Sequence, residues 1–295
     1  MSRFAEALDS GRFLVTAEVE PPKGVDLTAV FEKAGILKGI TDAVNVTDQQ
    51  ASVMRSSPWA VCRVLKDQGL EPIMQVTARD RNRIALQADI LAANIIGIEN
   101  FLFLTGDPTG TGDHPDAKPV FDLDVVAIIK AAASLQAGKD MAGHDLQGTP
   151  RLCLGAVANP GARPLEPELV KLEKKVQAGA RFIQTQAIYD VQEFAAFMEK
   201  IRHLKVAVLA GIILLKSGNQ ARFMNKNIPG IRVPDPLIAE MDEAKDKGAK
   251  SVEIASRTIV ELKGLARGIH VMALGWEKRI PAVLGASGLA DGHRL

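Results

Sequence analysis

The amino-acid sequence predicts an α/β fold, namely a (β/α)8 barrel of the TIM type built as one domain over residues 1–295. Short apolar, β-branched runs alternate with longer amphipathic runs, which is the order expected of alternating strands and helices. The short runs number eight, and 295 residues fit one barrel of roughly 250 residues with insertions. A doubly wound open sheet is the alternative fold that the same alternation allows.

The expected strands are brief and almost continuously apolar, as is typical of parallel strands that are buried on both faces. In chain order they are Phe13–Glu18, Ala43–Thr47, Pro72–Thr77, Phe101–Gly106, Leu152–Ala158, Phe182–Ile188, Ala207–Ile213 and Ile269–Leu274. Because the strands of such a barrel run in one direction, their carboxyl ends meet at one end, where the active sites of this fold lie.

Between the strands, apolar residues recur at three- and four-residue spacing, which indicates helices with one apolar face. The expected helices are Leu27–Leu37, Trp59–Gln68, Arg79–Ala93, Leu123–Ala133, Pro167–Ala178, Val191–His203 and Gln220–Asn225. Asp190 and Ser217 are suited to cap two of these helices, and Gly179 follows another where a C-terminal glycine is favoured.

Two longer segments depart from this alternation. Asp107–Asp122 is rich in Gly, Pro, Thr and Asp and has no periodicity, and long loops of this kind in compact domains are often functional. This loop follows the fourth strand, so we expect it at the active-site end of the barrel. Asp235–Gly268 has a helical pattern and predicts two extra helices, packed outside the barrel before the last strand.

Composition and charge argue against several classes of function. The 36 basic and 35 acidic residues leave a net charge of +1, which favours neither nucleic acid nor an anionic membrane as a partner. The chain shows no apolar leader and no run of ~18 uncharged apolar residues, so a soluble protein is expected, and its two free cysteines indicate a cytoplasmic location. Cys62 and Cys153 lie in apolar stretches and predict buried free thiols, too few to hold an iron–sulfur cluster. The five histidines lack the spacing of metal ligands, so no metal site is predicted.

Polar residues at the carboxyl ends of the expected strands are the candidates for chemistry. They are Glu18, Glu20, Asn45, Thr47, Asp48, Gln75, Thr77, Thr105, Asp107, Asn159, Gln184 and Gln186.

Glu18 is the first candidate, because an acid at the end of an apolar strand is costly unless it has a task or a partner. Burial of such a carboxyl favours its protonated form, which a general acid needs near neutral pH. A rim carboxylate paired with a Lys or Arg is an equally plausible interpretation. Glu20 lies two residues on, on the same side of the strand, and competes for the role.

Asp107 is the second candidate, in the stretch FLFLTGDPTGTGD. Gly106 before it allows the backbone to approach a flat ligand closely. The stretch lacks the lysine and spacing of a phosphate-binding loop and is not a G-x-G-x-x-G motif. A solvent-exposed turn is the alternative interpretation.

Two further patterns have weaker functional readings. Gln186 carries an amide that suits the edge of a heterocycle, although a core glutamine satisfied by a neighbouring strand is the more common case. Lys171, Lys174 and Lys175 lie on one expected helix and could meet a pyrophosphate, although such clusters are more often solvated.

Several short motifs, each at a strand end, occur in an order that resembles the methylenetetrahydrofolate reductase family. They are TAEVEPPKG, AVNVTDQ, QVTARDRN, FLFLTGDP, GAVANPGA, KLEKKVQAGARFIQTQAIYD and LAGIILLKS, and the resemblance runs from about Phe13 to about Leu289. It implies a barrel that binds FAD and a tetrahydrofolate derivative. It also implies hydride transfer through FAD that converts 5,10-methylenetetrahydrofolate to 5-methyltetrahydrofolate, or the reverse.

The resemblance also implies roles for individual residues. Glu18 matches the general acid, Asp107 an aspartate near both the pterin and the flavin, and Gln186 a folate contact. The positions that match flavin-binding residues are Thr47, Gln75, Leu104, Thr105, Gly106, Asp107, Asp122, Asn159, Glu168, Lys171, Lys174 and Lys175.

Some positions depart from the family pattern. Gln75 stands where many members have histidine, and Asn159 and Arg163 replace a tyrosine and a histidine. Gly218 stands where a phenylalanine that stacks on nicotinamide is often found, and Trp276 stands near the place of a substrate-binding arginine. The electron donor is therefore expected to be NAD(P)H or a redox partner subunit, and oligomer formation is left open. A pterin- or folate-binding barrel methyltransferase and a non-catalytic folate-binding subunit are the alternative functions.

Overall fold

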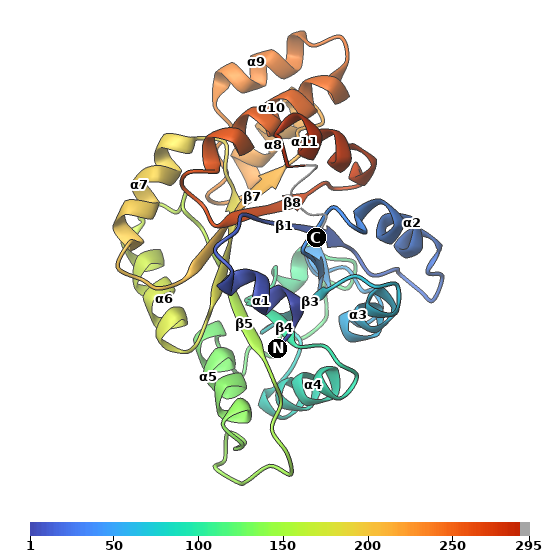
Figure 1. Cartoon of the computed structure of the whole chain (residues 1–295), viewed down its shortest axis with the longest axis vertical. Helices are drawn as coiled ribbons and strands as arrows, with labels where there is room; N and C mark the ends of the chain where they lie inside the picture. Colours follow the sequence, from blue (N-terminus) through green and yellow to red (C-terminus); the bar gives the residue numbers. More distant parts are fainter. Residues whose placement is uncertain (290–295) are drawn as a thin grey trace.

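The computed structural model describes residues 1–289 and contains the predicted closed barrel of eight parallel strands (Figure 1). The strands are β1 (Leu14–Val19), β2 (Ala43–Val46), β3 (Pro72–Thr77), β4 (Asn100–Leu104), β5 (Cys153–Ala158), β6 (Phe182–Ala187), β7 (Ala207–Ile213) and β8 (Gly268–Met272). Each agrees with its predicted strand to within two residues at either end. Residues 290–295, which the sequence assigned to the same domain, lie outside the described part.

The sheet closes between its first and last strands, so the alternative of an open doubly wound sheet is wrong. β1 pairs with β8 in parallel, from Leu14 opposite Gly268 to Ala17 opposite Val271. A Cβ atom on Gly268 would lie 2.3 Å from the carbonyl oxygen of Leu14, so this contact requires glycine. Closure leaves no edge strand among the described strands, and it places the first strand of the chain beside the last.

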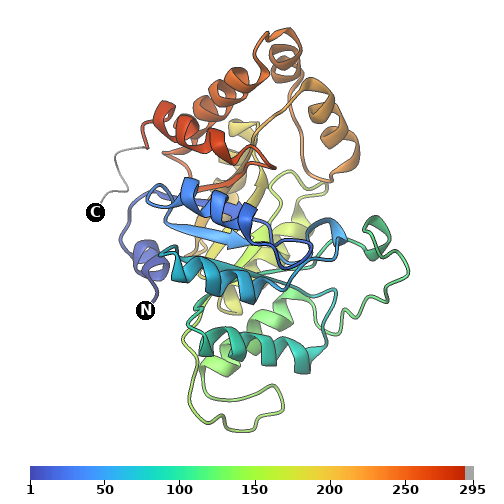
Figure 2. The same cartoon turned by 90° about the vertical axis from the view of Figure 1, so that its right-hand side faces the viewer.

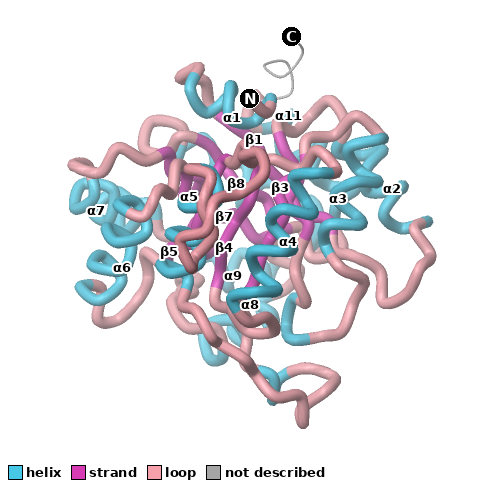
Figure 3. The backbone as a smooth tube through the Cα atoms, turned by 90° about the horizontal axis from the view of Figure 1, so that it is seen from below, coloured by secondary structure: helices cyan, strands magenta, loops and turns pink. Residues whose placement is uncertain are grey.

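Helices surround the strands on the outside of the barrel, as Figure 3 shows with strands in magenta and helices in cyan. They are α2 (Thr28–Leu37), α3 (Pro58–Asp67), α4 (Arg83–Ile95), α5 (Val125–Gln136), α6 (Glu166–Gln177), α7 (Val191–Ile201) and α8 (Gly218–Asn227). Asp190 and Ser217 accept the predicted capping hydrogen bonds from Glu193 N–H and Gln220 N–H, at 2.9 Å and 3.1 Å. Gly179, with φ +119°, follows α6 as predicted.

One predicted helix boundary is wrong in a way that matters for the site. α4 begins at Arg83 and not at Arg79, because the side chain of Asn82 accepts the N–H groups of Ile84 and Ala85 and so caps the helix there. Arg79 therefore belongs to the loop after β3.

The two extra helices before the last strand are present as predicted. They are α9 (Asp235–Glu243) and α10 (Lys247–Leu262), which lie outside the barrel beside α8 and α11 (Figure 1). Two short helices were not predicted, α1 (Arg3–Asp9) and α11 (Ile280–Ala286). Short 3-10 turns complete the chain: η1 (Gln50–Ser52), η2 (Thr109–Thr111) and η3 (Glu277–Arg279).

α1 closes the amino-terminal end of the barrel. Its Phe4 is fully buried and meets the ring of Phe182 edge-on, with ring centroids 5.1 Å apart. The ring of Phe182 occupies the place of a side chain on β5, since a Cβ atom on Gly155 would lie 2.2 Å from it. Ser2 adds a hydrogen bond of 2.5 Å to Asn100 at the start of β4. This end of the barrel is therefore a packed apolar core and not an opening.

Both cysteines are buried free thiols, as predicted. Burial raises the pKa of the Cys62 thiol, and it raises the pKa of Cys153 to about 12. Within residues 1–289, none of the helices combines the length and apolar character needed to span a bilayer.

The packing of α1 predicts that Phe4→Ala lowers the free energy of unfolding by about 3–5 kcal/mol, because a fully buried ring is lost from a closed core. Urea denaturation followed by circular dichroism measures this change. Phe31→Ala is the control: Phe31 is 45% exposed, so its truncation costs less than about 1 kcal/mol. Equal losses in the two variants would show that α1 does not stabilise the barrel.

Candidate active site

The carboxyl ends of the strands form a polar mouth at the end of the barrel opposite α1. Figure 2 shows the two ends, with α1 on the left and the green loop that follows β4 on the right. Inside the barrel, a lower apolar layer packs against α1 and includes Leu14, Ile73 and Phe182. Nearer the mouth the inward-facing side chains become polar, so the chemistry-bearing residues lie at this end.

Glu18 lies at the mouth on β1, and its side chain is only 15% exposed. Its Oε1 atom lies 3.2 Å from Nε2 of His270 and 3.3 Å from Nε2 of Gln75. Within residues 1–289 no Lys or Arg pairs with Glu18, so the interpretation as a rim ion pair is wrong for this residue. Glu20 is that rim residue, because its carboxylate pairs with Arg55 at 2.7 Å.

A chain of polar side chains continues from Glu18 into the barrel. Nδ1 of His270 lies 3.0 Å from Oγ1 of Thr16, and Nε2 of Gln184 donates to the same hydroxyl at 3.2 Å. Gln184 and Asn45 then form a pair of amide hydrogen bonds across the barrel, from β6 to β2. All four side chains are at most 3% exposed. Sequence reasoning missed His270 and Thr16, because each appears as one polar residue in an apolar strand.

The two glutamines of β6 have different environments. Gln184 is a core glutamine satisfied by partners across the barrel on β1 and β2, whereas Gln186 lies where the pairing of β6 with β7 shifts register. The carbonyl of the Gln186 side chain accepts the N–H of Ala187 at 3.0 Å. Gln186 is only partly buried, and its amide N–H groups have no partner among residues 1–289.

Asp107 follows β4 and is exposed at the mouth. Its carboxylate accepts the backbone N–H of Ala51 at 2.9 Å, which joins the loop after β4 to the loop after β2. In that loop Gln49, Ala51 and Ser52 all have left-handed backbone conformations, with φ of 49°, 55° and 58°. Gly112 packs against the same loop, where a Cβ atom would lie 1.8 Å from the carbonyl oxygen of Ser52. Left-handed non-glycine residues in series are strained, so the surrounding contacts must hold them in place.

Arg79 provides the main contacts that hold these loops. Its side chain is fully buried and donates to the carbonyl oxygens of Asp107 at 2.9 Å and Gln49 at 3.2 Å. It also pairs with Asp80 at 2.7 Å, and the hydrogen bond that it donates to that carboxylate raises the pKa of the guanidinium. The sequence placed Arg79 in a helix and so did not predict this role.

Two further ion pairs fasten the loop over residues 107–122. Asp113 accepts hydrogen bonds from the Lys23 side chain and from Met54 N–H, and the Lys23 contact lowers the pKa of Asp113. Asp122 accepts from Nε and Nη2 of Arg83, each at 2.9 Å, and this lowers the pKa of Asp122 to about 2. The carboxylate of Asp122, a predicted flavin contact, is thus engaged with α4 in this structure.

The predicted flavin-binding positions at the mouth fit a flat polar ligand. Thr47 is 1% exposed at the end of β2, and its Oγ1 atom has no partner among the described residues. Leu104 and Thr105 lead into Gly106, which has φ +88° and where a Cβ atom would make tight contacts of 3.1 Å with Thr77 and 3.2 Å with Arg79. An unsatisfied hydroxyl and a glycine backbone at the same end of the barrel both suit the polar edge of a ring.

The lysine cluster on α6 is divided between two faces of the helix. Lys171 and Lys174 are exposed, whereas Lys175 is 7% exposed and donates to the carbonyl oxygen of Val157 at 2.7 Å. Burial lowers the pKa of Lys175, and Glu168 lies 4.0 Å from its Nζ atom. Lys175 therefore does not share the exposed face of Lys171 and Lys174 but points toward β5.

The end of β5 is held by Glu168 and Asn159. Glu168 accepts the backbone N–H of Asn159 at 3.0 Å, and the Asn159 amide donates to the carbonyl of Pro229 at 3.0 Å. The Oδ1 atom of Asn159 is buried without a partner in the described chain. A hollow of about 590 Å³ near this point is lined by residues that include Arg163, Asn225 and Arg232.

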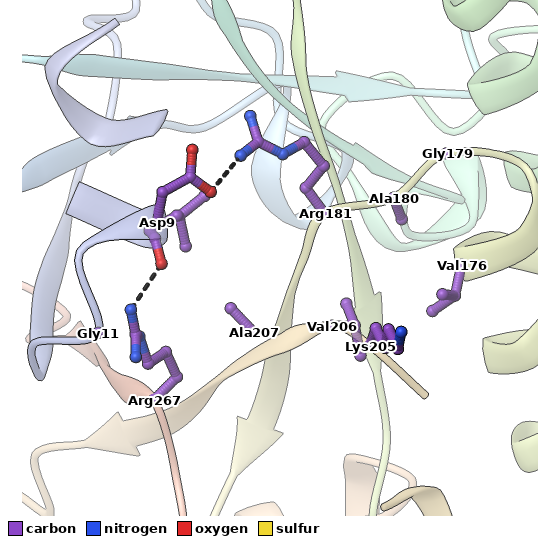
Figure 4. A pocket seen from close by; sticks show the side chains of 11 residues that line it. Asp9, Gly11, Val176, Gly179, Ala180, Arg181, Lys205, Val206, Ala207 and Arg267 are labelled. Carbon is purple, nitrogen blue, oxygen red and sulfur yellow. Dashed lines mark hydrogen bonds and ion pairs between the residues drawn. The ribbon is translucent and has the colours of Figure 1, made fainter. Parts of the chain in front are cut away.

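A second hollow, of about 670 Å³, lies at the opposite end of the barrel (Figure 4). Its charged side chains are engaged in structural contacts: Arg181 pairs with Asp9 at 2.6 Å, and Arg267 donates to the carbonyl of Leu8 at 2.5 Å. We place the site at the mouth and not here, because the amino-terminal end of such barrels is usually associated with stability. Among residues 1–289 no group of three His, Cys, Asp or Glu side chains is arranged to hold a metal ion.

Comparison with known proteins gives consistent results. The family model described as methylenetetrahydrofolate reductase matches residues 3–288. Methylenetetrahydrofolate reductase 1 of Schizosaccharomyces pombe is 24% identical over 249 residues, which cover 80% of this chain and 38% of that protein. The 5,10-methylenetetrahydrofolate reductase of Pectobacterium carotovorum is 23% identical over 239 residues, which cover 79% of this chain and 74% of that protein. The chain thus spans little more than a third of the length of several curated relatives it matches.

Similarity to solved structures supports the fold alone. A ligand-free tryptophan synthase structure from M. tuberculosis aligns over 100% of both chains with a TM-score of 0.53 and 13% identity. EDTA monooxygenase from Chelativorans sp. BNC1 covers 94% of this chain and 93% of its own, with a TM-score of 0.54 and 9% identity.

The contacts of Arg79 predict that Arg79→Leu loosens the loops at the mouth. We expect a loss of about 2–3 kcal/mol in the free energy of unfolding, below the value for a fully buried pair because Asp80 is partly exposed. Amide hydrogen exchange over residues 107–122 should accelerate about tenfold or more.

Arg83→Leu is the matched control, because Arg83 pairs with Asp122 at the other end of the same loop but is half exposed. Its loss should leave the free energy of unfolding nearly unchanged, because solvent screens the pair. If the two variants exchange alike, Arg79 does not organise the mouth.

Proposed function

This chain belongs to the methylenetetrahydrofolate reductase family, and on that premise we propose that it interconverts 5,10-methylenetetrahydrofolate and 5-methyltetrahydrofolate by hydride transfer through FAD. The observation that carries the proposal is Glu18, a nearly buried carboxyl group at the mouth that has no cationic Lys or Arg partner in the described chain. A carboxyl in such a place lies within reach of a substrate at the mouth and can exchange a proton with it.

Glu18 would act as the general acid. In the reducing direction, its O–H bond breaks as a new N–H bond forms at N10 of the folate. The bond from N10 to the one-carbon unit breaks with its electron pair left on N10, and N5 then carries an iminium group. FAD that has been reduced by the electron donor would supply the hydride for this iminium carbon, which becomes a methyl group. The residues of the mouth contribute by holding the acid and the substrate within reach of each other.

Other residues of the mouth would bind the substrate and the cofactor. Asp107 and Gln186 present a carboxylate and an amide that suit the polar edge of a pterin. The orphaned Thr47 hydroxyl and the backbone of Leu104–Gly106 fit the flavin ring. Gln75 lies beside Glu18 and would sit near both ligands.

The phosphate and ribityl parts of the cofactor would be held at the outer strand ends. Lys171 and Lys174 are exposed on α6 and suit a diphosphate. Glu168, Lys175 and Asn159 would support that region by fixing the end of β5, and Asp122 would approach the ribityl chain from the loop after β4.

The electron donor is NAD(P)H or a redox partner subunit. The printed names of two relatives specify NADH in Zea mays and NADPH in Caenorhabditis elegans. In this chain a Cβ atom at Gly218 would lie 2.1 Å from the carboxylate of Asp242, which would have to shift to admit a side chain there. Trp276 lies at the mouth between two cations, 4.7 Å from the Arg279 guanidinium and 5.8 Å from Nζ of Lys216. These replacements favour a partner subunit as the source of electrons.

Absorption spectroscopy tests the cofactor first. The purified chain should show a flavin spectrum, and FAD added in excess should remain bound through gel filtration, whereas FMN is the comparison ligand. Photoreduced protein should then be reoxidised by methylenetetrahydrofolate. A colourless protein that retains no flavin, alone or co-purified with partners from its native source, would favour the methyltransferase or a non-catalytic folate-binding subunit.

The role of Glu18 predicts that Glu18→Gln lowers the rate of flavin reoxidation by methylenetetrahydrofolate about 100- to 10,000-fold, the range typical of a general acid. The absorption spectrum and affinity for FAD should be unchanged. Stopped-flow absorbance measures both.

Glu20→Gln is the control, since Glu20 lies two residues away on the same side of the chain and forms only the rim pair with Arg55. It should keep a rate within about threefold of the original protein. If Glu18→Gln behaves like Glu20→Gln, Glu18 is not the acid.

A further inference from the structure

His270 connects the carboxyl group of Glu18 to the polar interior of the barrel. Its ring is 3% exposed on β8, with Nε2 3.2 Å from Oε1 of Glu18 and Nδ1 3.0 Å from Oγ1 of Thr16. A neutral imidazole carries its proton on one of these two nitrogens. Which nitrogen is protonated decides whether Glu18 receives a hydrogen bond from the ring or must donate one to it.

The amide pair deeper in the barrel sets the direction of this chain of hydrogen bonds. Asn45 donates to Gln184 at 2.7 Å and accepts from it at 3.0 Å. The amide nitrogen of Gln184 also donates to the hydroxyl of Thr16 at 3.2 Å, so Thr16 is an acceptor on that side. Thr16 has one proton left to donate, and its two neighbours are Nδ1 of His270 at 3.0 Å and the carbonyl of Ile269 at 3.2 Å. The carbonyl can only accept, whereas Nδ1 accepts only if the ring proton lies on Nε2, and the contact with Nδ1 is the shorter of the two.

We propose that Thr16 donates to Nδ1 of His270, so that the ring carries its proton on Nε2 and donates it to Oε1 of Glu18. Gln75 donates to the same oxygen at 3.3 Å. An oxygen that already accepts two hydrogen bonds is the poorer site for the carboxyl proton, so the acid proton of Glu18 lies on Oε2. Oε2 has no partner among residues 1–289 and is the atom left for the substrate. His270 is thus a positioning residue that turns the acid proton of Glu18 outward.

The side chains in this chain of contacts other than Glu18 and His270 are neutral, namely Thr16, Asn45, Gln75 and Gln184. None of these four neutral side chains therefore competes with Glu18 and His270 for the proton. In the other tautomer the ring proton of His270 lies on Nδ1, and Nε2 faces Glu18 without a proton. The carboxyl proton of Glu18 would then have to lie on Oε1, facing the interior of the barrel. The proposal depends on the proposed function only for the identity of the substrate that receives the proton.

Nitrogen NMR of the ligand-free protein tests the tautomer directly. The protein is labelled with ¹⁵N-histidine, and the ring signals of His270 are identified by their absence from the spectrum of His270→Gln. We expect the proton on Nε2. A bare Nε2 nitrogen would overturn the proposal. This measurement needs neither flavin nor folate, so its result holds even if the chain proves not to be a reductase.

Two substitutions then test the effect on the reaction. His270→Gln keeps an N–H donor near the position of Nε2, whereas His270→Leu keeps a similar volume without a donor. For methylenetetrahydrofolate reduction we expect His270→Leu to lower kcat about 10- to 100-fold with KM little changed, since a hydrogen bond to a charged group is lost once Glu18 gives up its proton. His270→Gln should restore kcat to within about threefold of the original protein.

Equal losses of kcat in both variants, with melting temperatures like that of the original protein, would overturn the positioning role. A rise in KM without a fall in kcat would do the same. If the unmodified protein reduces no folate under any donor, the proposed function fails and the NMR result alone decides this inference.

Discussion

The parallel pairing of β1 with β8 is the constraint on which the site depends. Glu18 and His270 are 252 positions apart in the sequence, and they meet because the first and last strands close the sheet side by side. Gly268 makes this approach possible at the lower end, where a side chain would collide with Leu14. The contact between the acid and its histidine is therefore a product of barrel closure and not of any local motif.

Much of the scaffold was predictable because each strand is buried on both faces and carries an uninterrupted apolar run. The helices α1 and α11 were missed because each has seven residues, too few for a helical period to stand out. At the site, the rule that chemistry lies at strand ends identified Glu18 and Gln75. It did not identify His270. The role of His270 depends on which strand lies next to β8, and the periodicity of a sequence does not say which strands are neighbours.

The loops at the mouth illustrate the same limit. A run such as QVTARDRN shows a basic residue near a strand end, but not that Arg79 is buried between the loops after β2 and β4. The three left-handed residues around Ala51 are stable only because buried donors and close packing at Gly112 hold them. In this arrangement Arg79 sets the position of Asp107, although Arg79 need not touch any ligand itself. Lys175 shows the reverse case, a residue that resembles a ligand contact but stabilises the end of β5.

The packing of Phe182 against Gly155 and Phe4 has a consequence for how this sequence can change over evolutionary time. The aromatic ring fills the space that a side chain at position 155 would need, so the two positions share one volume. A larger residue at 155 becomes tolerable only after the ring at 182 has been replaced by a smaller one, and neighbours of this kind are not independent in their effects. Substitutions here should therefore be accepted in a fixed order, and homologous barrels should carry correlated residues at the two positions.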